Sequence, residues 1–98
     1  MRSTLDTRIA LSCATDGDSF PAARALYWYC ADHHSGQTSA LYSILSTLPY
    51  RPGAMERSPD LYGMETEDWI YRELADGRMD PSDVLDWIQG VQRKRSLR

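Results

Sequence analysis

The chain has 98 residues, of which 42% are hydrophobic and 26% are charged, and its formal net charge is −3. This length is that of one domain, and the composition excludes a disordered or fibrous protein. Asp6 and Arg8 interrupt the apolar segment that a signal peptide needs, and the uncharged run 9–15 is too short to span a bilayer. We therefore expect a single soluble helical domain over residues 1–98, located in the cytoplasm and not bound to a membrane.

The first 17 residues have no clear hydrophobic period. Ile9, Leu11 and Cys13 alternate as they would in a strand, whereas Leu5, Ile9 and Cys13 fit a helical stripe equally well. We predict a loose, irregular N-terminal arm over residues 1–17.

Two helices are predicted next, over residues 20–34 and 38–48. The first has Asp18 or Ser19 as its N-cap, Pro21 in its first turn, and a glycine just beyond its end. The second carries leucine and isoleucine at three- and four-residue spacing and ends at a proline. The segment that follows contains three prolines and is predicted to be irregular.

Two further helices are predicted in the second half of the chain. One covers residues 65–77, with acidic residues in its first turn and Gly77 as its stop signal. The other begins with Asp80 as its cap and Pro81 in its first turn, and it runs into a basic C-terminal tail, residues 93–98. The predicted fold is all-α, a small bundle of four short helices in two hairpins.

A cysteine and both histidines lie close together in the sequence. On a helix, Cys30, His33 and His34 share one face, so they could bind zinc with Cys13 or Asp32, or Cys30 and His34 could form a nucleophile and base. The chain has no second C-x-x-C or H-x-x-H element and no readable oxyanion hole. We therefore expect Cys30 in the core, the histidines in the last helical turn, and no metal or cofactor. Both cysteines are expected to be free thiols, with a Cys13–Cys30 disulfide as the alternative.

The glycine between the first two predicted helices allows a comparison with a DNA-binding helix-turn-helix. Placing Gly36 in the turn puts Asp32 and Gln37 at positions that require small or apolar residues. The recognition helix would also lack lysine and arginine. We therefore expect no direct contact with nucleic acid.

Acidic residues are concentrated in the second half of the chain. Between Asp60 and Asp86 there are nine carboxylates and two arginines, a local balance of −7. The negative electrostatic field of this segment would attract basic surfaces. Several of these acidic residues are also explained without a partner, because helix N-termini favour negatively charged side chains. The carboxylates that we expect to contact a partner are Glu67, Asp68, Asp76, Asp83 and Asp86.

Three aromatic residues, Tyr27, Trp28 and Tyr29, are consecutive in the first predicted helix. Their directions spread over about 200°, so a single core face cannot bury all three. We expect one of them to face outward and choose Trp28 as an anchor for a partner. Coverage by neighbouring helices is the alternative.

Because no catalytic arrangement is complete, the sequence favours a small non-enzymatic interaction protein. We expect it to bind a protein partner with a basic surface through the acidic helical face and the exposed aromatic residues. In size and charge it is similar to phage-encoded anti-defence inhibitors, including anti-CRISPR proteins, which block nucleic-acid-handling complexes. The alternative is a metal-binding or thiol-dependent enzyme module built on Cys30, His33 and His34.

Overall fold

The computed structural model describes residues 4–48, 50 and 65–96, and every regular element within these ranges is a helix. In chain order the helices are α1 (Thr4–Thr15), α2 (Phe20–Asp32), α3 (Gly36–Leu45), α4 (Glu65–Ala75) and α5 (Pro81–Ser96). The predicted all-α class is confirmed. The predicted bundle of four helices is wrong, because α1 adds a fifth.

Helix α1 stands where an irregular N-terminal arm was predicted. Its buried face carries Thr7, Leu11 and Thr15, and the Thr15 hydroxyl donates a hydrogen bond to the Leu11 carbonyl at 2.7 Å. Two residues of the apolar stripe considered in the sequence face solvent instead, since Ile9 is 54% exposed and Cys13 is also exposed. Two threonines therefore occupy core positions that an apolar pattern would not identify.

Helix α2 begins at its predicted signals. The Asp18 carboxylate accepts a hydrogen bond from the Phe20 backbone N–H at 3.0 Å, and Pro21 lies in the first turn. The helix ends at Asp32, two residues earlier than predicted, because His33 is extended with φ −126° and ψ 93°.

Helix α3 follows after a short turn and begins with a capping box formed by Ser35 and Thr38. This arrangement satisfies two backbone N–H groups that a helix start leaves without partners. The sequence between His33 and Tyr50 contains no aspartate, glutamate, lysine or arginine. Helix α3 itself therefore carries no aspartate, glutamate, lysine or arginine.

Helices α4 and α5 begin and end close to the predicted positions. Gly77 follows α4 with φ +77°, and the Glu73 carbonyl accepts a hydrogen bond from the Arg78 backbone N–H at 2.9 Å. Asp80 precedes α5, which begins at Pro81. The Asp80 carboxylate accepts a hydrogen bond from the backbone N–H of Ser82 in the first turn. Helix α5 extends into the segment that was predicted as a basic tail.

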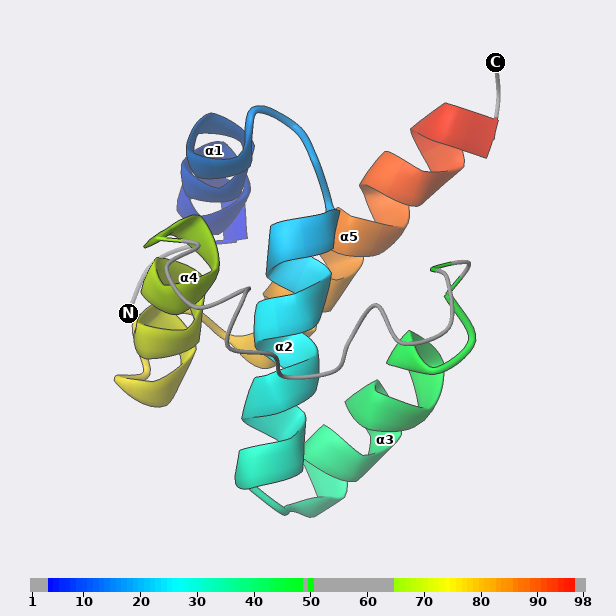
Figure 1. The fold of residues 1–98 in the computed structure, drawn as a ribbon. Helices are drawn as coiled ribbons and strands as arrows, with labels where there is room; N and C mark the ends of the chain where they lie inside the picture. Colours follow the sequence, from blue (N-terminus) through cyan, green and yellow to red (C-terminus); the bar gives the residue numbers. More distant parts are fainter. Residues whose placement is uncertain (1–3, 49, 51–64, 97–98) are drawn as a thin grey trace.

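Helix α2 lies at the centre of the molecule, with α4 on one side and α3 on the other, while α5 crosses behind it (Figure 1). Helix α1 packs on α5. The helices predicted to form a second hairpin thus have different main neighbours, since α4 packs on α2 and α5 contacts α1, α2 and α3. The core includes the fully buried side chains of Leu26, Ile70, Val84 and Ile88. None of the helices in the described part of the chain is long and apolar enough to cross a membrane.

Candidate functional site

The predicted partner-binding carboxylates do not lie on one face. Asp68 and Asp76 belong to α4 and the turn that follows it, whereas Asp83 and Asp86 belong to α5, which packs against other helices. Asp68, Asp76 and Asp86 are exposed, and Asp83 is half-buried in the first turn of α5.

Glu67 lies in the interior and is only 3% exposed. Its Oε2 atom is 3.1 Å from Nη1 of Arg24, which is fully buried. The Arg24 guanidinium carbon in turn lies 4.1 Å from the centre of the Trp28 ring. Glu67 therefore joins α4 to α2 and is not available to a partner, contrary to its predicted surface position.

Two opposing effects act on the Glu67 carboxyl group. Burial raises its pKa above the ordinary value of 4.5, while the neighbouring Arg24 charge and hydrogen bond lower it. Burial is the larger effect, so the net direction is upward. The ion pair thus offsets only part of the cost of placing a carboxylate inside the protein.

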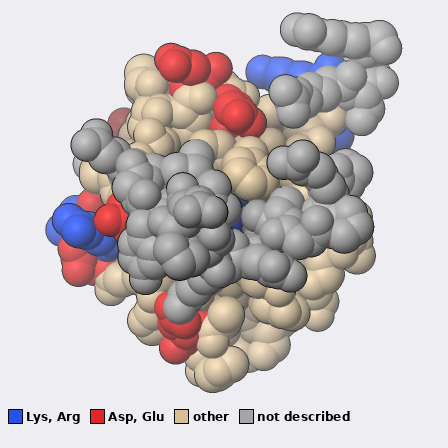
Figure 2. All heavy atoms as spheres, viewed as in Figure 1, with Lys and Arg blue, Asp and Glu red and all other residues tan. Residues whose placement is uncertain are grey.

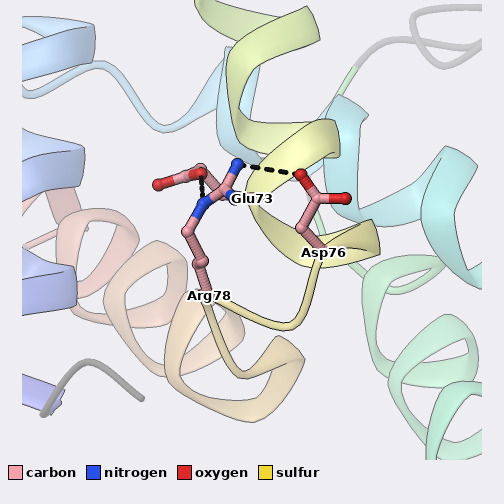
Figure 3. Close-up of polar contacts among 3 residues, drawn as sticks. All are labelled: Glu73, Asp76 and Arg78. Atoms are coloured by element: carbon pink, nitrogen blue, oxygen red, sulfur yellow. Dashed lines mark hydrogen bonds and ion pairs between the residues drawn. The ribbon is translucent and has the colours of Figure 1, made fainter.

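The exposed carboxylates of α4 and its C-terminal turn have arginine neighbours of their own. Arg78 lies between Glu73 and Asp76, with its Nη2 atom 2.8 Å from Asp76 Oδ2 and its Nε hydrogen-bonded to Glu73 (Figure 3). Arg72 and Asp68 are 3.6 Å apart on side chains that are 75% and 71% exposed. Such solvent-exposed pairs contribute at most about 1 kcal/mol, so a partner cation can compete for Asp68.

Figure 2 shows the resulting surface from the side of α2. Acidic and basic side chains are intermixed over α4, and the described residues that are visible over α3 are neither acidic nor basic. Among the described residues no ion pair involves Asp86 on α5.

Aromatic rings gather where α2 meets α4. The Tyr29 ring is stacked on His33, with centroids 4.5 Å apart, and meets Tyr71 edge-to-face at 6.2 Å. The Tyr71 hydroxyl donates a hydrogen bond of 2.6 Å to Asp32 Oδ2. Asp32 and His33 are exposed, while the two tyrosines are half-buried. We call these four residues, Tyr29, Asp32, His33 and Tyr71, the aromatic cluster.

The three consecutive aromatic residues of α2 each contact a different neighbour. Trp28 packs on Arg24, Tyr29 belongs to the aromatic cluster, and Tyr27 shares a 2.8 Å hydrogen bond with the hydroxyl of Tyr42 on α3. That bond raises the pKa of Tyr27. All three rings are half-buried, so no single one of them stands out as the outward-facing anchor.

The proposed metal or thiol site of Cys30, His33 and His34 is not assembled. Cys30 is buried, and burial raises its pKa from 9.0 to about 11, which keeps the thiol protonated and weakly nucleophilic at neutral pH. His33 and His34 follow the end of α2, so helical spacing does not align them with Cys30. Within the described residues no three His, Cys, Asp or Glu side chains are placed to hold a metal ion. Both cysteines are free.

Tyr71 is the residue of the aromatic cluster that sequence reasoning did not connect with binding, and Asp32 was considered for binding only as a possible zinc ligand. A local signal exists for Tyr71, because it follows Asp68 by three residues and helical spacing places both on one side of α4. The hydrogen bond between Tyr71 and Asp32 spans 39 residues and has no local signal.

Chemically, the aromatic cluster offers ring faces and carboxylate oxygens, which are groups that bind cations rather than groups that carry out a reaction. Its position across two packed helices fixes the relative placement of these groups. No protein-family model, curated protein or solved structure matches this chain.

Proposed function

We propose that this chain is a non-enzymatic interaction protein that binds a protein partner with a basic surface. The observation that supports this function is the aromatic cluster, where ordered rings lie beside exposed carboxylates. Aromatic side chains held rigidly at a surface lose little entropy on binding and are common anchors of protein interfaces.

The proposed binding surface extends outward from this cluster. Asp68 lies one turn before Tyr71 on α4, and Trp28 lies one residue before Tyr29 on α2. Glu67 is left out of the contact surface because it is buried, and we assign it the role of anchoring α4 through Arg24. The remaining carboxylates that we assign to partner attraction are Asp76, Asp83 and Asp86.

A small acidic binding protein can occupy the basic groove of a nucleic-acid-handling complex. We therefore propose inhibition of such a complex, by analogy in size and charge with phage anti-defence and anti-CRISPR proteins. Two free cysteines suit a reducing compartment, and we propose that the protein acts in the cytoplasm. No enzymatic role is proposed, because Cys30 is buried and both histidines follow the end of α2, so that they do not share a helical face with Cys30.

Affinity capture from extracts of the native host tests this function. We expect tagged wild-type protein to retain a nucleic-acid-binding complex, and the double variant Asp68→Lys/Asp86→Lys to retain at least about tenfold less of it. Asp6→Lys on α1, also an exposed position, is the matched control for a change of charge. The captured complex should bind its nucleic acid less tightly when free protein is added in a gel-shift assay. Equal capture by the wild type and the double variant would contradict the proposal.

A further inference from the structure

One arginine-binding arrangement already exists inside the protein. The guanidinium of Arg24 lies 4.1 Å over the Trp28 ring of α2 and 3.1 Å from the Glu67 carboxylate of α4. An aromatic face and a carboxylate, supplied by two packed helices, thus hold one planar cation. This combination suits arginine, whose flat guanidinium can stack on a ring while its N–H groups contact a carboxylate.

The aromatic cluster presents the same kinds of group about one turn beyond Trp28 on α2 and one turn beyond Glu67 on α4. Rings come from Tyr29 on α2 and Tyr71 on α4, and Asp32 supplies the carboxylate. His33 extends the ring stack outward from Tyr29 at a centroid distance of 4.5 Å and an interplanar angle of 20°. Because Asp32 and His33 are exposed, this second arrangement opens toward solvent, whereas Arg24 is enclosed.

We propose that the aromatic cluster is the docking site for an arginine side chain of the basic partner. This inference deepens the proposed function and rests on it. The guanidinium stacks on the outer face of His33, continuing the stack from Tyr29, and donates hydrogen bonds to Asp32. Lysine fits less well, because its ammonium is a strongly hydrated point charge that cannot stack.

Two synthetic peptides of equal length and charge, one an arginine–glycine repeat and the other a lysine–glycine repeat, provide the probes. Each is titrated into the protein while the ring signals of Tyr29, His33 and Tyr71 are followed by aromatic ¹H–¹³C NMR. We expect the arginine peptide to shift these signals and to bind roughly five- to tenfold more tightly than the lysine peptide.

Substitutions at exposed positions distinguish arginine docking at the aromatic cluster from general electrostatic attraction to the acidic protein. Asp32→Asn should weaken binding of the arginine peptide by about fivefold, whereas Asp6→Asn removes the same charge at an exposed position of α1 and should change it by less than about twofold. His33→Phe keeps a ring and should preserve the preference for arginine, while His33→Ala should reduce it.

The failure of this inference is distinct from the failure of the proposed function. If both peptides bind equally well, and Asp32→Asn and Asp6→Asn have equal effects, arginine docking is overturned while attraction to a basic partner stands. If neither peptide binds to the folded protein, both the docking site and the basic partner are contradicted.

Discussion

Arg24 and Glu67 form an ion pair inside the protein, and a substitution that removes only one of the two charges is expected to lower stability strongly. Both charges have left water, and their attraction offsets the loss of hydration only while both are present. Removing one partner leaves a buried charge without compensation, whereas replacing both with apolar groups of similar size is often neutral. The raised pKa of Glu67 shows that burial dominates at this position even with Arg24 in place.

We predict that Arg24→Met lowers the free energy of unfolding at pH 7 by about 3–5 kcal/mol, and that Arg24→Met/Glu67→Leu recovers most of this loss. Without Arg24, the pKa of Glu67 rises further above 4.5. The folded state then keeps a proton that the unfolded state has lost, so the stability of the variant falls as the pH rises above 4.5. Urea unfolding should show the smallest deficit below that pH. A double variant no more stable than Arg24→Met would contradict this account.

The two cysteines should differ in reactivity, because one is exposed and the other buried. At pH 8 iodoacetamide should add rapidly to Cys13 only, since the pKa of Cys30 is about 11 and its sulfur is shielded. Mass spectrometry over time should show one fast adduct, and a second only when urea unfolds the chain. Cys13→Ser is the control and should abolish the fast adduct. Two fast adducts on the native protein would show that Cys30 is accessible.

At the level of helices, local signals set most boundaries and tertiary contacts set the packing. The sequence signals for helix ends include Pro21, Gly77 and Pro81. Helices α2 and α5 begin at or next to these prolines, and α4 ends shortly before Gly77. The buried face of α1 could not be predicted, because it includes Thr7 and Thr15, residues that carry hydroxyl groups.

The packing of α4 on α2 was also beyond sequence reasoning. It involves the contact of Arg24 with Glu67 and that of Tyr71 with Asp32, between residues 43 and 39 positions apart. The same limit applies to the candidate site. Acidic and aromatic residues could be recognised in the sequence. Their assembly into the aromatic cluster depends on the packing of α4 on α2.

Two glycine substitutions test the helix boundaries. Gly77→Ala places a side chain at φ +77° and should lower stability by about 1 kcal/mol, although a Cβ there meets no atom within 4 Å. Gly90→Ala, inside α5 and equally uncrowded, should raise stability by about 0.5–1 kcal/mol because alanine favours the helix. Thermal unfolding should therefore move in opposite directions for the two variants. A shift of the same sign would contradict the role of Gly77 as a helix stop.

Across the whole molecule, α3 differs from the other helices of the described ranges in carrying no charged side chain. The carboxylates proposed to attract a partner lie on α4, its C-terminal turn and the first half of α5, while α3 carries none of the four charged residue types. With a formal charge of −3, the molecule should attract a basic partner, most strongly toward the surfaces that carry these exposed carboxylates.

We predict that the association is steered by charge. The Debye length is about 8 Å at physiological ionic strength, so the association rate with the arginine–glycine peptide should fall as salt is raised from low to moderate concentration. Asp83→Lys/Asp86→Lys should slow association more than it speeds dissociation, as measured by stopped-flow fluorescence. If the association rate changes with neither salt nor charge reversal, these carboxylates are solvated surface groups without a role in binding, and the interface lies elsewhere.

The uncharged segment between His33 and Tyr50 also determines how the protein orients near charged materials. On an anion-exchange resin or a positively charged sensor chip, the carboxylates turn toward the matrix, because α3 offers the matrix no charge to attract. The carboxylates proposed to attract a partner are then held against the matrix and hidden from the analyte. A biotin attached at the exposed Ser43 of α3 fixes the protein through a helix without charged side chains, which leaves the carboxylates of α4 and α5 accessible to the analyte.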